Sequence, residues 1–437
     1  MKPLFIISCP IDTYSGYGAR SRDLVKSIIK SDKYDVKVLP QRWGNCPWGF
    51  VEDHPEEWGF LTPHLLPQGN QLPKQPEIWA QITVPNEFQR VGKFNIGITA
   101  GIETTICHGS WVEGLNRMDL NLVSSNHSKN VFESMNFEKK DEKGNILGHV
   151  KLEKPIEVIF EGIELEKFFP SKSKSTIDLS EIKEPFAYLF VGHWMQGSIG
   201  EDRKNVGLLL KSFYETFKNK KKTPALILKC SGAGASYMDR DFILDKIQQV
   251  KSSIKADSLP NVYLLHGEFT DKEMNELYNH SKVKAMLSLT KGEGFGRPLL
   301  EFSLVKKPII STKWSGHLDF LDKNFTTLVD GELKKVHSSA AVKDVLMEEG
   351  EWFAPNLMEV SNHLQNMFSN YENYTKGAML QYHRSKNKFS FAKMCELIDK
   401  TLTQSIPDFP KELKLNLPKL KKPKLELPKL ELPKLKQ

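Results

Sequence analysis

A strand that runs into a glycine-rich turn and then a helix constrains the fold of this chain more than any other segment. Lys284–Leu289 (KAMLSL) reads as a buried strand, and Gly292–Gly296 (GEGFG) forms the turn. Pro298 is placed to open the helix at its first position, because the first turn of a helix leaves its N–H groups unpaired and proline has none to lose. Such strand–turn–helix units build parallel α/β sheets.

The same turn carries candidate binding groups. Backbone amides at a helix N-terminus bind anions. Glu293 lies on the turn, and Glu301 follows eight residues later, in the predicted first turn of the helix. Carboxylates accept hydrogen bonds from hydroxyls. An anion site beside two such carboxylates suggests a phosphate attached to a polyol, as in a nucleotide sugar.

The N-terminus repeats the pattern. Leu4–Cys9 reads as a strand, a loop with Ser15-Gly16-Tyr17-Gly18 follows, and Ala19–Lys30 reads as a helix, which together resemble the opening of a Rossmann unit. The two glycines allow positive φ and close approach of a ligand to the backbone. Phosphate binding here and a plain strand-to-helix turn both remain open.

The alternation of strands and helices predicts an α/β fold with two Rossmann-like domains and a cleft between them. We place the first domain at 1–163, a polar linker at 164–185, the second domain at 186–380, a C-terminal helix that packs back on the first domain at 381–405, and a tail at 406–437. Further strands are expected at Tyr34–Leu39, Ile78–Val84, Phe94–Ala100, Leu120–Ser124, Glu157–Phe160, Ala187–Val191, Leu226–Cys230, Val262–Leu265, Pro308–Thr312 and Thr326–Val329. Helices are expected at Asp271–Asn279 and within 357–405, and a hairpin tip at Lys143-Gly144-Asn145.

Residues 41–76 form a long insertion with little periodicity, and its tryptophans are Trp43, Trp48 and Trp58. Exposed tryptophans would suit stacking on sugar rings or an apolar acceptor, whereas buried ones would pin the loop to its own domain. Glu103 follows a predicted strand, where ligand contacts concentrate in open α/β sheets. His108 and His127 lie nearby, and for both a structural or solvated role outweighs a catalytic one.

Composition limits the classes of protein. The 437 residues carry a net charge of +7, but the tail from Lys411 contributes about +6, so the body is close to neutral and is not a bulk nucleic-acid binder. The five cysteines are scattered and form no CxxC pair, which indicates a reducing, cytoplasmic location without a disulfide framework. No apolar run approaches a membrane span.

The tail repeats Leu-Pro-Lys-Leu, and prolines this frequent exclude a stable helix. A solvated appendage is the simplest interpretation. Contact of the tail with a membrane surface, which would make the protein peripheral, or with an acidic partner or nucleic acid, also stays open.

Several motifs in the right order resemble the large family of retaining GT-B glycosyltransferases (glycosyl transferases group 1, glycogen-synthase-like). They are SGYGARSRDL, VSSNHSKNVF, VIFEGIELEKFFP, FVGHWMQGSIGEDRKNVGLLLKSF, HGEFTDKEMNELYNHS and KGEGFGRPLLEFSLVKKPII, and they span about residues 1–405. The last contains the E-x7-E signature of that family, Glu293 and Glu301. The resemblance therefore implies a GT-B fold and transfer of a sugar from a nucleotide-sugar donor to a glycan or other hydroxyl acceptor, with retention of configuration.

The resemblance also implies roles for single residues. Glu293 and Lys204 would be the central catalytic and donor-binding groups, with Glu293 on a sugar hydroxyl and Lys204 on the diphosphate. Glu301 would bind the ribose, and Glu103 or His108 could stand in for the cleft histidine of many members. The remaining donor-binding residues would be Gly16, Tyr17, Gly18, His193, Arg203, Gly267, Glu268, Gly294, Phe295 and Gly296.

The chain departs from the family pattern at the phosphate site. His193 stands where an arginine is usual, so Arg203 is expected to supply that charge, or a protonated His193 binds phosphate. No cofactor and no metal are expected, because lysine, arginine and helix dipoles would hold the leaving diphosphate. Asp239-Arg240-Asp241 matches the metal-binding DxD of the other glycosyltransferase fold only superficially, and we interpret it as a solvated helix start.

Two other functions fit the same features. A viral type of GT-B enzyme glycosylates a modified base in DNA, which the basic tail allows and the near-neutral body disfavours. A non-catalytic GT-B-like scaffold would recruit a partner through the tail, although Lys204, Glu293 and Glu301 argue against a loss of activity. The particular nucleotide, sugar, acceptor and oligomeric state are not encoded in any motif.

Overall fold

The computed structural model describes residues 2–67, 72, 74–140, 143–173, 175–232 and 234–410. Met1–Ile406 form one compact unit. The tail from Lys411, and with it the interpretation of its repeats, lies outside the described residues.

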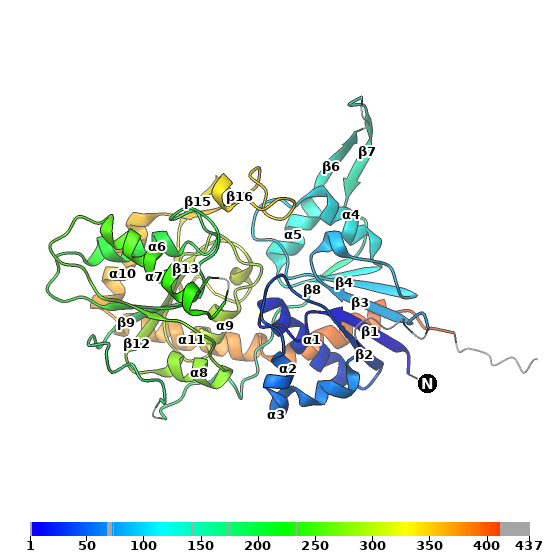
Figure 1. The fold of residues 1–437 in the computed structure, drawn as a ribbon, viewed down its shortest axis with the longest axis horizontal. Coiled ribbons are helices and arrows are strands. Elements are labelled where there is room, and N and C mark those ends of the chain that lie inside the picture. Colours follow the sequence, from blue (N-terminus) through cyan, green and yellow to red (C-terminus); the bar gives the residue numbers. More distant parts are fainter. Residues whose placement is uncertain are drawn as a thin grey trace, which may run out of the picture. The chain divides into compact units, whose positions relative to one another are not determined.

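Residues 4–158 build a six-stranded, all-parallel sheet in the order β2-β1-β3-β4-β5-β8 (Figure 1). The elements are β1 Leu4–Cys9, α1 Gly16–Ser31, β2 Asp35–Pro40, β3 Ile78–Ile82, η2 Pro85–Glu87, β4 Phe94–Ile98, α4 Gly109–Arg117, β5 Leu120–Val123, α5 Asn126–Ser134 and β8 Ile156–Val158. Its central strands are short runs of buried apolar residues, as expected for a sheet covered on both faces.

Residues 187–329 build a second parallel sheet in the order β11-β10-β9-β12-β13-β14, which is the strand order of the Rossmann fold. Its elements are β9 Ala187–His193, α6 Val206–Phe217, β10 Ala225–Ser231, α7 Tyr237–Ser252, β11 Val262–Leu265, α8 Asp271–Asn279, β12 Val283–Ser288, α9 Arg297–Ser303, β13 Ile309–Thr312, η3 Gly316–Asp319 and β14 Thr327–Val329. The prediction of an α/β fold with two Rossmann-like sheets is confirmed.

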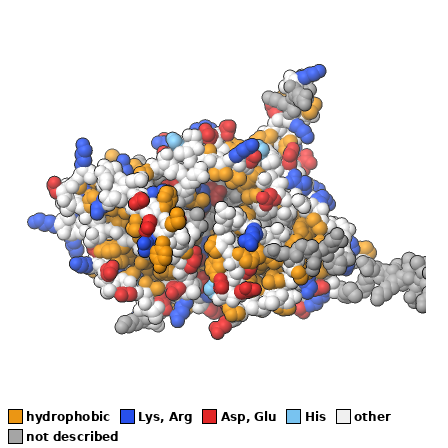
Figure 2. All heavy atoms as spheres, viewed as in Figure 1, with side chains coloured by type: hydrophobic (Ala, Val, Ile, Leu, Met, Phe, Trp, Pro, Cys, Tyr) orange, Lys and Arg blue, Asp and Glu red, His pale blue; other side chains and the backbone are white. Residues whose placement is uncertain are grey.

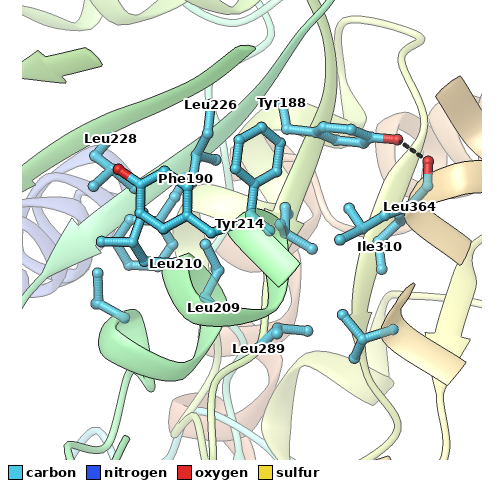
Figure 3. Packing of buried hydrophobic residues seen from close by; sticks show 14 of the residues in the cluster. Tyr188, Phe190, Leu209, Leu210, Tyr214, Leu226, Leu228, Leu289, Ile310 and Leu364 are labelled. Atoms are coloured by element: carbon cyan, nitrogen blue, oxygen red, sulfur yellow. Dashed lines mark hydrogen bonds between the residues drawn. The ribbon is translucent and has the colours of Figure 1, made fainter. Parts of the chain in front are cut away.

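Aromatic and aliphatic side chains pack between the second sheet and its helices (Figure 3). Tyr188 is fully buried there and donates its hydroxyl to the Leu364 carbonyl at 2.7 Å, which satisfies the one polar atom of the ring. This bond links β9 to α10 (Leu357–Ser369), so the core of the sheet is anchored to the C-terminal helices.

Three helices follow the second sheet, as the sequence predicted for 357–405: α10, α11 Glu372–Lys388 and α12 Phe391–Ser405. The last of them packs against α1, far away in sequence. Ile163 and the start of α12 exchange backbone hydrogen bonds, because Ile163 N donates to Phe389 O at 3.2 Å and Phe391 N donates to Ile163 O at 2.8 Å. The start of α12 is thereby tied to the segment that leaves the first sheet.

The structure contains elements that the sequence did not predict. Residues 41–76 are not wholly irregular, because short helices α2 Phe50–Asp53, α3 Pro55–Trp58 and η1 Gly59–His64 lie there. Trp58 is buried, and Trp43 stacks on Tyr17 with ring centroids 3.9 Å apart. An antiparallel pair, β15 Gly331–Lys335 and β16 Glu351–Pro355, follows β14 and encloses η4 Ser338–Ala340.

The hairpin predicted around Lys143-Gly144-Asn145 is confirmed as β6 Asn136–Lys140 and β7 Ile146–Lys151, which stand apart from the neighbouring sheet (Figure 1). The described residues of the segment 164–185 form no helix or strand, yet Phe168, Leu179 and Ile182 are buried in the core of the second half. In the part of the chain that the structure describes, no helix combines the length and apolarity of a membrane span.

Candidate active site

The strand order of the second sheet reverses between β9 and β12, and ligands of open α/β sheets bind beyond the carboxyl ends of such strands. His193 ends β9, and the turn Gly292–Gly296 follows β12. The two predicted halves of the phosphate site therefore meet at the switch point of the sheet.

An ion cluster lies at this point. Lys204 Nζ is 2.6 and 2.8 Å from the two carboxylate oxygens of Glu293. Arg203 donates to the Gly292 carbonyl at 2.9 Å and lies 3.4 Å from Glu293 Oε2 and 3.6 Å from Glu103 Oε1. We call Glu103, Arg203, Lys204 and Glu293 the ion cluster. The structure thus brings together four candidate residues from three distant segments of the sequence, around 103, 203–204 and 293.

Charge pairing sets the protonation state of the cluster. Burial raises the pKa of Glu293, but the adjacent Lys204 and Arg203 outweigh it and bring that pKa down to about 2. Burial lowers the pKa of Lys204, and Glu293 opposes this. Glu293 is 6% exposed, so its carboxylate is held as an anion by two cations rather than by water.

Backbone of the first half packs directly on the glycine-rich turn. A Cβ on Gly292 would come within 2.0 Å of the Glu103 carbonyl oxygen, and one on Gly294 within 2.6 Å of the Ala100 carbonyl oxygen. Ser124 donates to the Gly294 carbonyl at 3.1 Å. Glycine at 292 and 294 is required by this close approach. Gly296 has φ +96° and precedes α9, where residues other than glycine are disfavoured.

Glu301 belongs to a second charged group. The helix α9 begins at Arg297, one residue before Pro298, so Glu301 lies in the second turn and not in the first as predicted. Arg297 donates to Glu301 at 3.0 Å and to Asp23 of α1 at 2.5 Å, and Tyr278 donates its hydroxyl to Glu301 at 3.0 Å. Burial, opposed by Arg297 and reinforced by Asp271, raises the pKa of Glu301 to about 7.

This raised pKa predicts a pH dependence of stability. A carboxyl with a folded pKa of about 7 against an ordinary 4.5 stabilises the fold fully below pH 4.5 and loses that contribution as the pH rises through 7. We expect the unfolding free energy of wild type to fall by about 2–3 kcal/mol relative to that of Glu301→Gln between pH 4.5 and 8. Urea unfolding at both pH values measures the difference, and parallel pH profiles would contradict the assignment.

A cavity of about 1780 Å³ adjoins these groups. Four of the predicted donor-binding residues line it: Gly16, His193, Glu268 and Glu301. Arg297 and Asp23 line it as well. Tyr17, Gly18, Gly267, Gly294, Phe295, Gly296 and the ion cluster are not part of its lining. His193 connects the two regions, because it lines the cavity and the charges of Lys204 and Arg203 act on its ring.

The glycine motif near the N-terminus has a different geometry from the one expected. The helix predicted at Ala19 begins at Gly16 with Ser15 as its cap, so Gly16, Tyr17 and Gly18 form its first turn. Ser15 Oγ accepts from Gly18 N at 2.9 Å, and neither glycine has a positive φ. Tyr17 is held by a 2.9 Å contact between its hydroxyl and Thr99 Oγ1. Among these three residues, only Gly16 faces the cavity.

The two glycines should therefore differ in tolerance. A Cβ on Gly18 would lie 2.3 Å from the Thr13 carbonyl oxygen, whereas one on Gly16 would meet nothing within 4 Å. Because the obstacle is backbone, we expect Gly18→Ala to lower the unfolding free energy by about 1–3 kcal/mol. Gly16→Ala, the matched control, should leave it unchanged or raise it. Equal stability of both variants in urea unfolding would contradict the close packing at Gly18.

The surroundings of His193 favour its neutral form. Its Nδ1 lies 3.0 Å from Ser231 Oγ. Desolvation and the positive charges of Lys204 and Arg203 lower the pKa of His193 from its ordinary value. A neutral imidazole at pH 7 follows, so a protonated His193 on phosphate is disfavoured, and Arg203 is the better source of the charge.

The loop after β11 edges the cavity through Glu268 and Phe269. Gly267 has φ +108°, and its carbonyl accepts from Lys229 at 2.5 Å. The interpretation of Asp239 as solvated is wrong. Its carboxylate accepts from Gly232 N at 2.9 Å and lies 2.8 Å from His266 Nε2, so it ties α7 to the loop after β10. No group of three or more candidate metal ligands occurs among the described residues.

His108 caps α4 through Ser110 and lies 3.5 Å from Asp344, consistent with the structural role that we favoured. His127 is half-buried with its ring centroid 4.7 Å from that of Trp314, and desolvation lowers its pKa to about 4. Sequence reasoning missed Arg297, Asp23 and His317. Arg297 stood inside the quoted motif and could have been noticed there, but its partner Asp23 is 274 residues away. His317, fully buried beside Glu293, donates to the Thr312 carbonyl at 2.7 Å.

Two Rossmann-like parallel sheets in one chain are the architecture of the GT-B glycosyltransferase fold. In this protein, Glu103 from the first half lies beside Arg203 from the second. Residues 195–352 match the family model "Glycosyl transferases group 1", which confirms the resemblance seen in the motifs for this part of the chain. No curated protein matches the sequence.

Solved structures resemble the whole chain at low sequence identity. A complex of Anabaena Alr3699/HepE with UDP and glucose has TM-score 0.58 at 12% identity and covers 92% of this chain and 100% of its own. A glycosyltransferase from Rickettsia africae has TM-score 0.59 at 13% identity, with 93% and 100% covered. Sucrose-phosphate synthase from Thermosynechococcus elongatus has TM-score 0.58 at 12% identity, with 92% and 99% covered. At these identities the likeness establishes the fold.

Proposed function

We propose that this protein transfers a sugar from a nucleotide-sugar donor to a hydroxyl acceptor, with retention of configuration and without a metal. The observation that carries the proposal is the pairing of Lys204 and Arg203 with Glu293 at the switch point of the second sheet. Two cations there can neutralise a leaving diphosphate, and a carboxylate beside them can accept a hydrogen bond from the sugar. The bond between the sugar and the diphosphate breaks, the acceptor oxygen bonds to the sugar, and the proton of the acceptor hydroxyl passes to the released diphosphate or to water.

The donor would extend from the ion cluster into the cavity. Lys204 and Arg203 would bind the diphosphate once it displaces Glu293 from them. Glu301 would accept from the ribose hydroxyls, and the backbone near Gly267 and Glu268 would edge the base. Glu268 and Glu301 line one cavity, which supports the proposal that ribose and base are bound side by side there. The Anabaena protein shares the fold and was solved in complex with UDP and glucose, so a UDP-sugar is the first donor to test.

We assign the acceptor to the first domain, 1–163, and the donor to the second, 186–380, with 164–185 as the connection between them. Glu103 contributes from the first domain, because its carboxylate lies 3.6 Å from Arg203. The acceptor is a glycan or another hydroxyl compound. On the face drawn in Figure 2, Lys and Arg are interspersed with Asp and Glu rather than gathered in one basic patch, which favours this acceptor over DNA.

Thermal-shift screening of UDP-, GDP- and ADP-sugars tests the proposal. A ligand at about 100 times its dissociation constant adds about 2.7 kcal/mol to stability, which gives a clear rise in Tm. We expect one nucleotide series to stabilise the protein and its sugar to be turned over. If no donor binds and none is hydrolysed, the chain is a non-catalytic scaffold and the proposal is wrong.

A further inference from the structure

Three aromatic side chains form a continuous surface at one wall of the cavity. Tyr14, Phe50 and His54 are in ring contact, with centroids 5.0 Å apart for Tyr14 and Phe50 and 4.4 Å for Phe50 and His54. All three line the cavity, and the proposed function uses none of them. We call them the aromatic shelf. Phe50 and His54 come from the insertion 41–76, whose role the sequence left open.

The shelf is built onto the loop that leads to Gly16. Phe50 N donates to the Asp12 carbonyl at 3.1 Å, and Val51 N donates to the Asp12 carboxylate at 2.7 Å. Tyr14 N donates to the Pro47 carbonyl at 3.0 Å. The insertion is therefore fixed to the strand-to-helix loop by backbone bonds, and the shelf cannot shift independently of it.

A buried arginine holds the central ring. The guanidinium carbon of Arg22 lies 3.4 Å from the centroid of Phe50. Arg22 is 4% exposed and donates to the Ile11 and Thr13 carbonyls at 2.9 and 3.0 Å. Because both partners are already fixed, a ligand that contacts Phe50 loses little binding energy to side-chain ordering.

The residues proposed to bind the nucleoside line the same cavity. Glu268, Phe269 and Glu301 belong to its lining together with the shelf. Lys167 joins the two sides, since it pairs with Asp271 of α8 at 2.9 Å and with Glu57 of the insertion. A nucleoside whose ribose is bound by Glu301 would therefore place its base in the same cavity as the aromatic shelf.

We propose that Tyr14, Phe50 and His54 stack on the nucleobase of the donor, so that the insertion 41–76 completes the nucleotide site from the first domain. Stacking on an aromatic ring suits any base, and here the rings of Tyr14 and His54 are inclined by 65° and 42° to that of Phe50. The inference rests on the proposed function and extends it to residues outside the family motifs. An acceptor sugar is the competing occupant, because sugar faces also pack on aromatic rings.

Calorimetric titration with UDP, GDP and ADP distinguishes these occupants. Phe50→Leu keeps the apolar volume and removes the ring, Phe50→Trp restores a ring, and Phe60→Ala is the control. Phe60 is in the same insertion, is 39% exposed and is not part of the cavity lining. For the nucleotide that binds wild type most tightly, we expect about tenfold weaker binding to Phe50→Leu, and wild-type affinity in Phe50→Trp and Phe60→Ala. Inorganic pyrophosphate, which has no base, should bind all four proteins equally.

Each outcome separates the claims. Unchanged nucleotide affinity of Phe50→Leu overturns the stacking and leaves the donor site intact. A higher KM for the acceptor alone, with unchanged KM in donor hydrolysis, assigns the shelf to the acceptor and overturns the inference. Equal weakening of nucleotide and pyrophosphate, with a lower Tm, shows a structural role and also overturns it. If wild type binds no nucleotide, the proposed function falls and the inference with it.

Discussion

Replacement of Lys204 by methionine is expected to lower kcat/KM for the donor about 100-fold. The Lys204 side chain is 14% exposed, and its ammonium lies 2.6 Å from the Glu293 carboxylate, so solvent screens this charge less than one at the surface. Its loss removes a charged hydrogen bond to the diphosphate and leaves the Glu293 anion with one cation fewer. Removal of a preorganised charged donor from such a site costs about 3–4 kcal/mol of transition-state stabilisation. Release of nucleotide from the donor measures the effect.

The matched control is Lys211→Met, on the exposed face of α6. It should retain wild-type kinetics, since the only change there is one solvated charge. A Lys204→Met variant that folds normally and keeps its kcat/KM would remove Lys204 from the donor site.

Glu293→Gln is expected to reduce turnover at least tenfold, because one charged hydrogen bond to the sugar exceeds about 1.4 kcal/mol. Binding of the free nucleoside diphosphate should not weaken, because in the ligand-free protein Glu293 occupies the two cations that the diphosphate needs. We therefore expect this variant to lose turnover while it keeps its affinity for the nucleoside diphosphate. Unchanged turnover would exclude Glu293 from the reaction.

We also expect Glu293→Gln to change how the unfolding free energy depends on pH. The folded pKa of Glu293 is about 2 and its ordinary value 4.5, so its contribution is present above pH 4.5 and is lost as the pH falls toward 2. Wild type should exceed Glu293→Gln by about 3 kcal/mol in unfolding free energy at neutral pH, and the difference should shrink in acid. Exposed Glu348→Gln is the control and should show no such trend.

Local patterns were sufficient to predict much of the fold. The apolar runs at 187–191 and 226–230 gave strands because a sheet buried on both faces needs uninterrupted apolar residues. The helix Asp271–Asn279 was predicted with its observed bounds, and Thr270 and Glu273 form a capping box there. By contrast, β15 is exposed along its whole length and reads GELKK, so no buried face marked it as a strand.

The parts of the site that sequence reasoning missed depend on contacts between distant segments. Gly294 was interpreted as a donor-binding residue and Gly292 as part of the turn, but the lack of side chains at both positions also admits the backbone of Ala100 and Glu103. The role of Arg297 becomes visible only in the folded chain, where its guanidinium donates hydrogen bonds to both Asp23 and Glu301. The short helices α2 and α3 have four residues each, too few for a periodic pattern, and Asp12 fixes the start of α2 through backbone bonds.

Nucleotide release from UDP-, GDP- and ADP-sugars by wild type and Lys204→Met tests the central claim most directly. We predict that wild type releases the diphosphate from at least one donor and that Lys204→Met does so about 100-fold more slowly. Absence of release by wild type from every donor, with and without glycan acceptors, would contradict the proposed function.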